Sequence, residues 1–247
     1  YIRRLQDYEK DSPWHKFRFS LIKKFLIYQF QNKKKPISVI DIGCGTGEIM
    51  SKICEEKFVN NVQGIDLNEV GLEICKQKCL NAKYGDIQNF EMSKKTFDVV
   101  LCLDVFYSKK IDIKRSLINI KKILENDSII IINSAALGIF SGVDDFLDDG
   151  GRRINKREFN EIIYSLGYSI IDSFYWNYLL SIPLIFLRKI ELILLPKNES
   201  RIAKLSSKRI FNSLIFKIFL IEAFLYRAFK INPFGASYFA VISLNNN

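Results

Sequence analysis

Four aspartates stand at the ends of short apolar segments, and this placement is typical of a ligand-binding edge. The segments are ISVIDIG, GIDLN, YGDI and LCLDVF, and the residues are Asp41, Asp66, Asp86 and Asp104. A carboxylate at the end of a parallel strand can accept hydrogen bonds from the hydroxyl groups of a ribose. Asp66, in GIDLN, has this position, although each acid taken alone could also be a helix cap or a turn residue.

A glycine-rich stretch, VIDIGCGTGEIM, follows the first of these aspartates and places glycines at 43, 45 and 47. Glycine lets the backbone turn sharply and approach a ligand closely, and the following helix offers its N-terminus to that ligand. The dinucleotide fingerprint GxGxxG would need a third glycine where this chain has Glu48. Because a carboxylate there is unfavourable for a pyrophosphate, the spacing favours a cofactor without a diphosphate.

Strand-like and helix-like patterns alternate along the chain, which predicts an α/β fold with a parallel, doubly wound sheet. We expect strands over 37–43, 62–67, 82–87, 97–106, 128–135, 168–176 and 236–244, and helices over 17–30, 47–57, 68–80, 112–124 and 156–166. About 60 residues rich in Leu, Ile and Phe separate the last two strands, and we expect two or more helices there.

The motif DIGCGTGE resembles the first motif of the class I (Rossmann-like) S-adenosylmethionine-dependent methyltransferases, and the later strand ends match the same family in order. The resemblance implies a seven-stranded, doubly wound Rossmann-like sheet with a helical insertion before the last strand. It also implies S-adenosyl-L-methionine as cofactor and an enzyme that transfers a methyl group. The cofactor-binding positions that it implies are Asp41, Gly43, Cys44, Gly45, Thr46, Gly47, Asp66, Leu67, Asn68, Asp86, Ile87, Leu103 and Asp104.

The resemblance assigns roles to several of these residues. It implies that the glycine loop wraps the methionine part of the cofactor and that Asp66 binds the ribose hydroxyls. It places Asp86 beside the adenine amino group and Ile87 against the ring. Leu103 and Asp104 match residues that flank the cofactor.

The segments SPWHKFR and GRRINKREFNEIIYSLGY resemble one bacterial branch of the family, often associated with cell-envelope or lipid-linked intermediates. In that branch an aromatic residue and an arginine stand before the first helix, where this chain has Trp14 and Arg18. The substrate-binding positions predicted in this way are Trp14, Arg18, Tyr107, Arg152 and Arg153.

Methyl transfer mainly requires that the nucleophile is placed correctly, and a base is needed only where the acceptor must lose a proton. Many relatives carry a histidine after the fourth strand, but this chain has Tyr107 and Ser108 there, and its one histidine is His15. We predict His15 and Tyr107 as catalytic candidates. The carboxyls of Asp144, Asp145, Asp148 and Asp149 are alternatives, and surface or packing roles stay open for all six.

The net charge of +10 suggests an anionic partner, and residues 177–235 hold ten Lys and Arg against three Glu, which is +7. Charges within 177–196 argue against a transmembrane helix. The segment fits either helices lying on an anionic membrane surface or a cap over the substrate pocket. We accordingly predict a helical lid at 1–35, a cofactor-binding core at 36–176, this insertion at 177–235, and the final strand within 236–247.

The predicted function is methyl transfer to an oxygen or nitrogen of a small-molecule or lipid-linked acceptor. A nucleic-acid methyltransferase is disfavoured, because the basic residues lie among aliphatic rather than stacking aromatic side chains. A non-catalytic S-adenosylmethionine-binding protein stays open, as does the oligomeric state. Five cysteines without a CxxC pair and without a completed metal set, and no signal-peptide pattern, predict a cytoplasmic protein that binds no metal. The membrane-surface alternative for 177–235 would place it on the inner face of the membrane as a peripheral protein.

Overall fold

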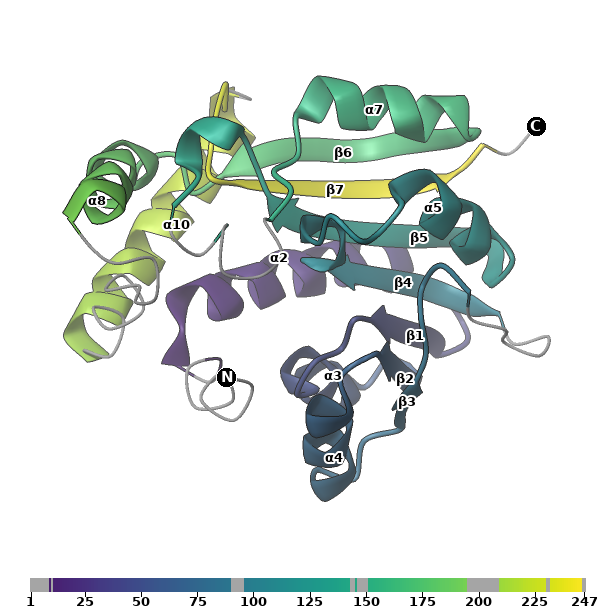
Figure 1. The fold of residues 1–247 in the computed structure, drawn as a ribbon. Helices are drawn as coiled ribbons and strands as arrows, with labels where there is room; N and C mark the ends of the chain where they lie inside the picture. The colour runs from purple at the N-terminus through teal and green to yellow at the C-terminus, as the bar shows by residue number, and fades with distance from the viewer. Residues whose placement is uncertain are drawn as a thin grey trace.

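A seven-stranded sheet forms the centre of the computed structural model (Figure 1), which describes residues 9, 11–89, 96–142, 145, 151–194, 209–229 and 232–245. The strand order is β3-β2-β1-β4-β5-β7-β6. The strands are β1 (Ile37–Ile42), β2 (Val59–Asp66), β3 (Ala82–Tyr84), β4 (Phe97–Leu103), β5 (Leu124–Ala135), β6 (Tyr168–Trp176) and β7 (Ser237–Leu244). All neighbours pair in parallel except β7, which is antiparallel to both β5 and β6.

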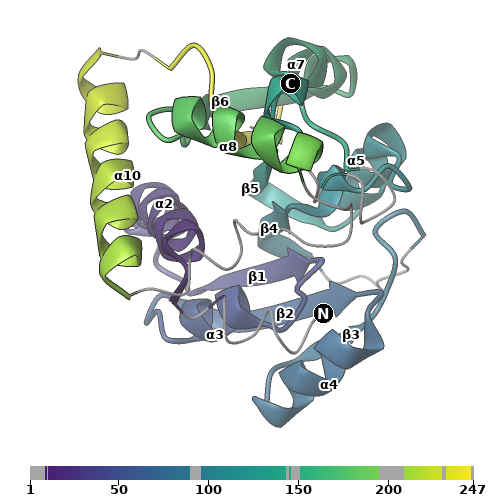
Figure 2. The ribbon, with the colours of Figure 1, turned by 60° about the vertical axis from the view of Figure 1, so that its left-hand side comes forward.

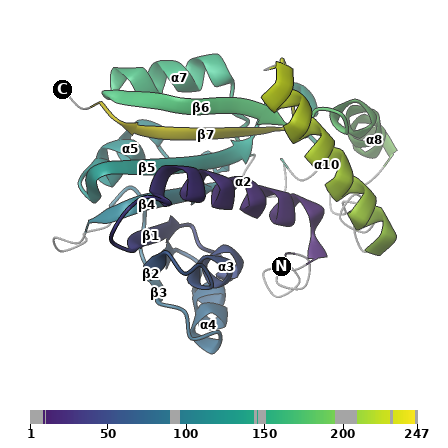
Figure 3. The same ribbon diagram turned by 180° about the vertical axis from the view of Figure 1, so that it is seen from behind.

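Helices cover both faces of the sheet (Figures 1 and 3). They are α2 (Pro13–Phe30), α3 (Glu48–Cys54), α4 (Glu69–Gln77), α5 (Ile113–Lys121), α7 (Lys156–Ser165), α8 (Ser181–Leu194) and α10 (Arg209–Phe229), with short 3-10 turns η1 (Val105–Tyr107) and η2 (Gly138–Phe140). Among the described helices, none combines the length and apolar character needed to cross a membrane.

Local sequence explains where these elements begin. The strand β4, FDVVLCL, is buried at every position, as expected of a parallel strand covered on both faces. Three helices begin at residues whose side-chain oxygen accepts a backbone hydrogen bond, which satisfies amides that the first turn leaves without partners. These residues are Asn68 before α4, Asp112 before α5 and Asn155 before α7.

The sheet separates two hydrophobic cores. On one face, α2, α3 and α10 pack against strand residues such as Leu101 and Phe239. On the other face, α5 and α7 pack against residues such as Val100 and Tyr238. Figure 3 shows α2 running along the first of these faces, with α10 beside it.

The strand order reverses between β1 and β4, and this switch point is where open α/β sheets bind ligands, outside the carboxyl ends of the strands. These ends lie on the left in Figure 1, next to α8 and α10. Figure 2 looks onto this edge and shows α8 in front of it, with α10 to one side. The helix α8 also packs against η2, which follows β5.

The predicted doubly wound, seven-stranded α/β sheet with helices inserted before the last strand is confirmed. Two details differ. The sheet is mixed, because the insertion leaves and returns at the same edge, where Ser237 pairs with Trp176, so β7 must run against β6. The expectation that Trp14 and Arg18 precede the first helix is wrong, since both lie inside α2.

Glycine 71 sets how closely α4 approaches the glycine loop. A Cβ added there would lie 2.6 Å from the carbonyl oxygen of Gly45. We expect Gly71→Ala to lower the free energy of unfolding by up to about 2 kcal/mol, because overpacking costs about 1–3 kcal/mol and the better helix former returns about 1 kcal/mol. Urea denaturation measures this. Gly138→Ala is the matched control, because a Cβ at 138 would meet no atom within 4 Å; equal losses in the two variants would contradict the prediction.

Candidate functional site

The loop after β1 is shaped by glycines in the left-handed backbone region. Gly43, Gly45 and Gly47 have φ values of 73°, 54° and 73°, which side chains with a Cβ rarely adopt. The amides of Gly43 and Cys44 both donate to the carbonyl oxygen of Ile65, at 2.8 and 3.1 Å. The loop is therefore fixed to the end of β2.

Asp66 adds a side-chain anchor at the same place. Its Oδ2 accepts a hydrogen bond from the Gly45 amide at 2.7 Å, and its Oδ1 accepts one from the Asn68 amide at 2.7 Å. From the side of α4, the Nζ of Lys78 donates to the carbonyl oxygen of Thr46 at 2.9 Å. Each oxygen of Asp66 keeps a second lone pair, so the carboxylate can hold the loop and still accept from a ligand.

A residue ahead of α2 also contacts the loop. The Oε2 of Glu9 accepts a hydrogen bond from the Thr46 hydroxyl at 2.5 Å, and burial raises the pKa of Glu9. The Nε2 of His15 lies 3.9 Å from the Oε1 of Glu9, and burial lowers the pKa of His15 to about 2. His15 is thus neutral and a weak base at neutral pH. Sequence reasoning missed Glu9, because no motif surrounds it.

Asp41 lies beneath the loop and is 1% exposed. Its Oδ1 has no hydrogen-bond partner among the described residues. Burial raises its pKa to about 7, the charges of Asp66 and Glu9 act in the same direction, and Arg18 opposes them. The protonation of this carboxyl therefore changes near neutral pH.

A chain of polar contacts runs along the carboxyl ends of β4, β5 and β6. Arg18 of α2 forms an ion pair with Asp104, whose backbone is left-handed with φ 63°. The Nδ2 of Asn133 donates to the Oδ1 of Asp104 at 3.2 Å, and the Nε1 of Trp176 donates to the Oδ1 of Asn133 at 3.0 Å. We missed Asn133 in the sequence; its only signal is a polar residue near the end of an apolar strand.

The turn after β3 holds the next pair of predicted cofactor residues. The Oδ1 of Asp86 accepts from the Gln88 amide at 2.9 Å. Ile87 is buried, and its carbonyl oxygen accepts from the Nδ2 of Asn119 at 3.0 Å. The remaining members of the set lie near the same edge: Leu103 is buried at the end of β4, while Leu67 is exposed after β2. The structure thus brings the predicted cofactor residues together at the ends of β1, β2, β3 and β4.

Tyr107 lies in η1, directly after β4, and its hydroxyl donates to the Oδ1 of Asp145 at 3.2 Å. Asp145 is buried and also binds Arg153, whose Nε and Nη2 lie 2.8 and 3.0 Å from its two oxygens. This two-bond pair anchors the loop before α7. The other predicted carboxyls, Asp144, Asp148 and Asp149, lie outside the described residues.

The remaining predicted substrate residues point in different directions. The Nη1 of Arg152 donates to the carbonyl oxygen of Ile111 at 2.8 Å, on the α5 side of the sheet. Trp14 packs edge-on against Phe219 of α10, with ring centroids 5.5 Å apart. Within this predicted set, Arg18 joins the cofactor residues through the ion pair of its side chain with Asp104. Tyr107 joins them through its backbone amide, which donates to the carbonyl oxygen of Asp104 at 3.2 Å.

These residues fit a cofactor of the expected kind. A Cβ added at Gly45 would meet no atom within 4 Å, so open space lies beside this glycine. The buried Oδ1 of Asp41 and Nε of Arg18 find no hydrogen-bond partner in the part of the chain that is described. The carboxylates of Asp66 and Asp86 suit ribose hydroxyl and amino groups and oppose a diphosphate. Among the described residues, no three His, Cys, Asp or Glu side chains are grouped as metal ligands would be.

Comparison with known proteins gives one family and several partial relatives. The family model described as "Methyltransferase domain" matches residues 14–157. The ubiquinone/menaquinone biosynthesis C-methyltransferase of Campylobacter jejuni is 26% identical over 106 residues, which is 40% of this chain and 45% of that protein. The mitochondrial ubiquinone biosynthesis O-methyltransferase of Saccharomyces cerevisiae is 30% identical over 80 residues, 30% of this chain and 26% of that protein. The matches thus span less than half of each relative.

Solved structures share the fold at low identity. The plantazolicin methyltransferase BpumL in complex with SAH has a TM-score of 0.63 at 18% identity, over 99% of this chain and 89% of that one. A methyltransferase from Clostridium acetobutylicum has a TM-score of 0.58 at 12% identity, over 93% and 91%. The [4+2]-cyclase SpnF has a TM-score of 0.56 at 12% identity, over 90% and 78%. Proteins with this fold therefore include enzymes of more than one reaction type.

The raised pKa of Asp41 predicts how stability depends on pH. The folded protein keeps this proton up to about pH 7, whereas the ordinary value is 3.8, so the folded state binds more protons between these values. The free energy of unfolding should therefore fall as pH rises through this window, by at most about 1.4 kcal/mol per pH unit from this group. Asp41→Asn cannot ionise and should show a shallower fall. Urea denaturation from about pH 5 to about pH 8 measures the slopes.

Two comparisons isolate the share of Asp41. Glu222 has its pKa raised to about 7 by burial and adds a fall of the same sign, so the difference between wild type and Asp41→Asn is the quantity of interest. Glu73→Gln, at an exposed carboxyl on α4, should keep the wild-type slope. An Asp41→Asn slope equal to that of wild type would refute the assignment.

Proposed function

The chain belongs to the methyltransferase domain family, and on this premise we propose that it is an S-adenosylmethionine-dependent methyltransferase. The observation that carries the proposal is the glycine loop held on Asp66, with open space beside Gly45. The family match covers the segments that form this loop and the ends of β2, β3 and β4. Together they supply a binding edge of the kind that the sequence predicted.

Individual residues would have distinct tasks in holding the cofactor. Asp66 would accept from ribose hydroxyls with the lone pairs that its two amide partners leave. Asp86 and Ile87 would contact the adenine, and the backbone at 43–47 would follow the methionine part. When bound, S-adenosylmethionine supplies a methyl group on a sulfonium, which a nucleophile can displace.

For the acceptor, we propose a small-molecule or lipid-linked compound that offers an oxygen or a nitrogen. The described residues favour placement over strong base catalysis, because the pKa of His15 is lowered to about 2 and the Tyr107 hydroxyl is engaged by Asp145. His15 and Tyr107 stay the catalytic candidates. Arg18, on the edge beside Asp104, is the residue best placed to contact an acceptor or the cofactor.

The outward surfaces of α8 and α10 carry the apolar and basic side chains that binding to an anionic membrane requires. On α8, Ile182, Phe186 and Ile190 repeat every four residues and are exposed. On α10, Leu214, Ile221 and Phe224 are exposed at spacings that share one face. Exposed cations stand among them, at Lys189 and Lys217. We propose that this surface lies on the acidic inner face of the cytoplasmic membrane, with apolar side chains in the lipid boundary.

One observation favours a second candidate function. The cyclase SpnF shares this fold. A cofactor-binding chain that performs another reaction, or none, therefore competes with methyl transfer, and turnover decides between them.

The first test uses S-adenosylmethionine labelled on its methyl group, incubated with the protein and a cell extract, followed by separation of lipid from aqueous products. We expect label in the lipid phase that depends on the protein. Asp66→Ala should lose at least about tenfold of cofactor affinity, measured by calorimetry with S-adenosylhomocysteine, because a charged hydrogen-bond acceptor is removed. Tyr28→Ala, at an exposed side chain of α2, is the matched control and should keep the cofactor affinity and the protein-dependent label of wild type.

Two outcomes decide against the proposal in different ways. Label only in the aqueous phase would support methyl transfer and reject a lipid-linked acceptor. Cofactor binding without protein-dependent label in any fraction would reject the reaction and favour the binding-only reading.

Membrane contact has its own prediction. We expect the protein to sediment with vesicles that contain phosphatidylglycerol and less with phosphatidylcholine alone, and added salt should weaken the binding. Phe186 and Phe224 are 66% and 67% exposed, and replacing each with Ser should weaken binding about tenfold, since a buried Phe contributes about 1.5–3 kcal/mol. Tyr164→Ser, on α7 at the opposite sheet face and 60% exposed, should bind like wild type. Equal losses at all three sites would exclude a specific membrane face.

A further inference from the structure

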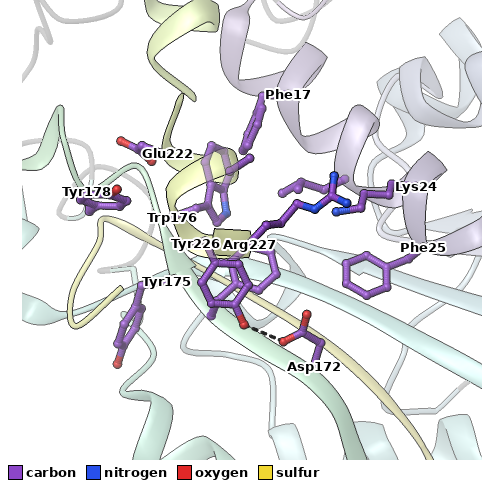
Figure 4. Close-up of a pocket in the computed structure, with 13 residues that line it drawn as sticks. Phe17, Lys24, Phe25, Asp172, Tyr175, Trp176, Tyr178, Glu222, Tyr226 and Arg227 are labelled. Carbon is purple, nitrogen blue, oxygen red and sulfur yellow. Dashed lines mark hydrogen bonds between the residues drawn. The ribbon is translucent and has the colours of Figure 1, made fainter. Parts of the chain in front are cut away.

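A cavity of about 200 Å³ lies between α2, β6 and α10 (Figure 4). None of the predicted cofactor-binding residues lines it. Its walls come from one face of the sheet and from the inserted helix, whereas the cofactor edge lies at the strand ends. The cavity is therefore a separate feature of the fold.

Aromatic side chains form most of the cavity wall. Phe17 of α2 packs against Trp176 of β6, with ring centroids 5.2 Å apart. Phe174 of β6 packs against Tyr226 of α10, with centroids 4.6 Å apart. Such a wall takes up an apolar group because burial removes the apolar surface of both from water.

The two carboxyls that line the cavity are already engaged within the protein. The Oδ1 of Asp172 accepts from the Tyr226 hydroxyl at 2.8 Å. The oxygens of Glu222 accept from the amides of Asn177 and Leu179, each at 2.7 Å. These carboxyls serve to fix α10 onto β6 and onto the segment before α8.

Two exposed cations, Lys24 and Arg227, also line the cavity. Figure 4 shows their side chains reaching to the same side, away from Glu222 and Tyr178. No salt bridge joins Arg227 to any residue that the structure describes. A ligand with an apolar chain in the cavity would therefore meet positive charge at this side.

We propose that this cavity binds a single-chain amphiphile with an anionic head group, of the size of a medium-chain carboxylate. The hydrocarbon chain of this ligand lies against Phe17, Phe174 and Trp176, and its carboxylate lies at Lys24 and Arg227. The volume limits the chain, because about 200 Å³ is below the roughly 300–1,000 Å³ of pockets for larger small molecules. The site is independent of methyl transfer and of membrane contact, so the failure of either would leave it standing.

Tryptophan fluorescence can measure binding in the cavity, because Trp176, one of the two tryptophans of the protein, lines it. In a Trp14→Phe background Trp176 is the sole tryptophan, and titration with decanoate should change its fluorescence until the site is saturated. Decanol, which has the same chain without the charge, should bind about tenfold more weakly. Butyrate, with the charge and a short chain, should give no saturable change.

Variants distinguish the contact with the hydrocarbon chain of the ligand from the contact with its carboxylate. Arg227→Gln should weaken decanoate about tenfold and leave decanol unchanged, because it removes a charged hydrogen-bond donor. Lys217→Gln is the matched control, since Lys217 is an exposed cation of the same helix outside the cavity. Ala223→Leu fills the cavity and should weaken decanoate and decanol alike.

Three results would overturn the proposal. They are an unsaturable response to decanoate, equal losses in Arg227→Gln and Lys217→Gln, and unchanged binding in an Ala223→Leu protein that melts like its parent. Should Ala223→Leu fail to fold, the comparison of Arg227→Gln with Lys217→Gln still decides, because both change exposed residues.

Discussion

The attachment of the glycine loop to the end of β2 is the constraint on which the candidate site depends. Two amides of the loop share the Ile65 carbonyl oxygen, and a third reaches Asp66. These bonds hold Gly43 and Gly45 in backbone conformations that are rare for other residues. Because Asp66 is both an anchor and a predicted ribose ligand, the loop and the ligand site are formed by one side chain. If the loop moved away from β2, the loop conformation and the ligand site would both be lost.

The helix α2 joins this edge to the rest of the molecule. Its Arg18 pairs with Asp104, and its Phe17, one residue earlier, packs against Trp176 and Phe219. The polar chain through Asn133 ends on the same Trp176. Two routes, one polar and one aromatic, thus connect the ends of β4 and β5 with the cavity under α10. Breaking the polar route leaves a buried hydrogen-bonding group, such as the Nε1 of Trp176, without its partner, which costs about 1–3 kcal/mol.

Local patterns in the sequence were sufficient for the elements and for the acids at the strand ends. The run FDVVLCL reads as a buried strand because each of its side chains is covered, and Asp104 follows it. The direction of β7 depends instead on where a 60-residue insertion returns, which no local pattern encodes. Glu9 and Asn133 escaped for a related reason: their partners, Thr46 and Asp104, are distant in the sequence. The engagement of Arg153 by Asp145 likewise needs the folded loop before it becomes visible.

The inserted helix α10 presents apolar side chains on two sides, and the buried carboxyl of Glu222 is one of the groups that hold it in place, beside the bond of Tyr226 to Asp172. Glu222 is 2% exposed and binds two amides just before α8, so moving α10 away would leave these groups without partners. The inner side of α10 closes the aromatic cavity, while its outer side, with Leu214 and Phe224, faces away. Because the helix is fixed by Glu222, a bilayer on the outer side and an amphiphile on the inner side would act on one rigid element. The insertion therefore links apolar contacts outside the core to α2, and through Arg18 to the edge where the cofactor residues meet.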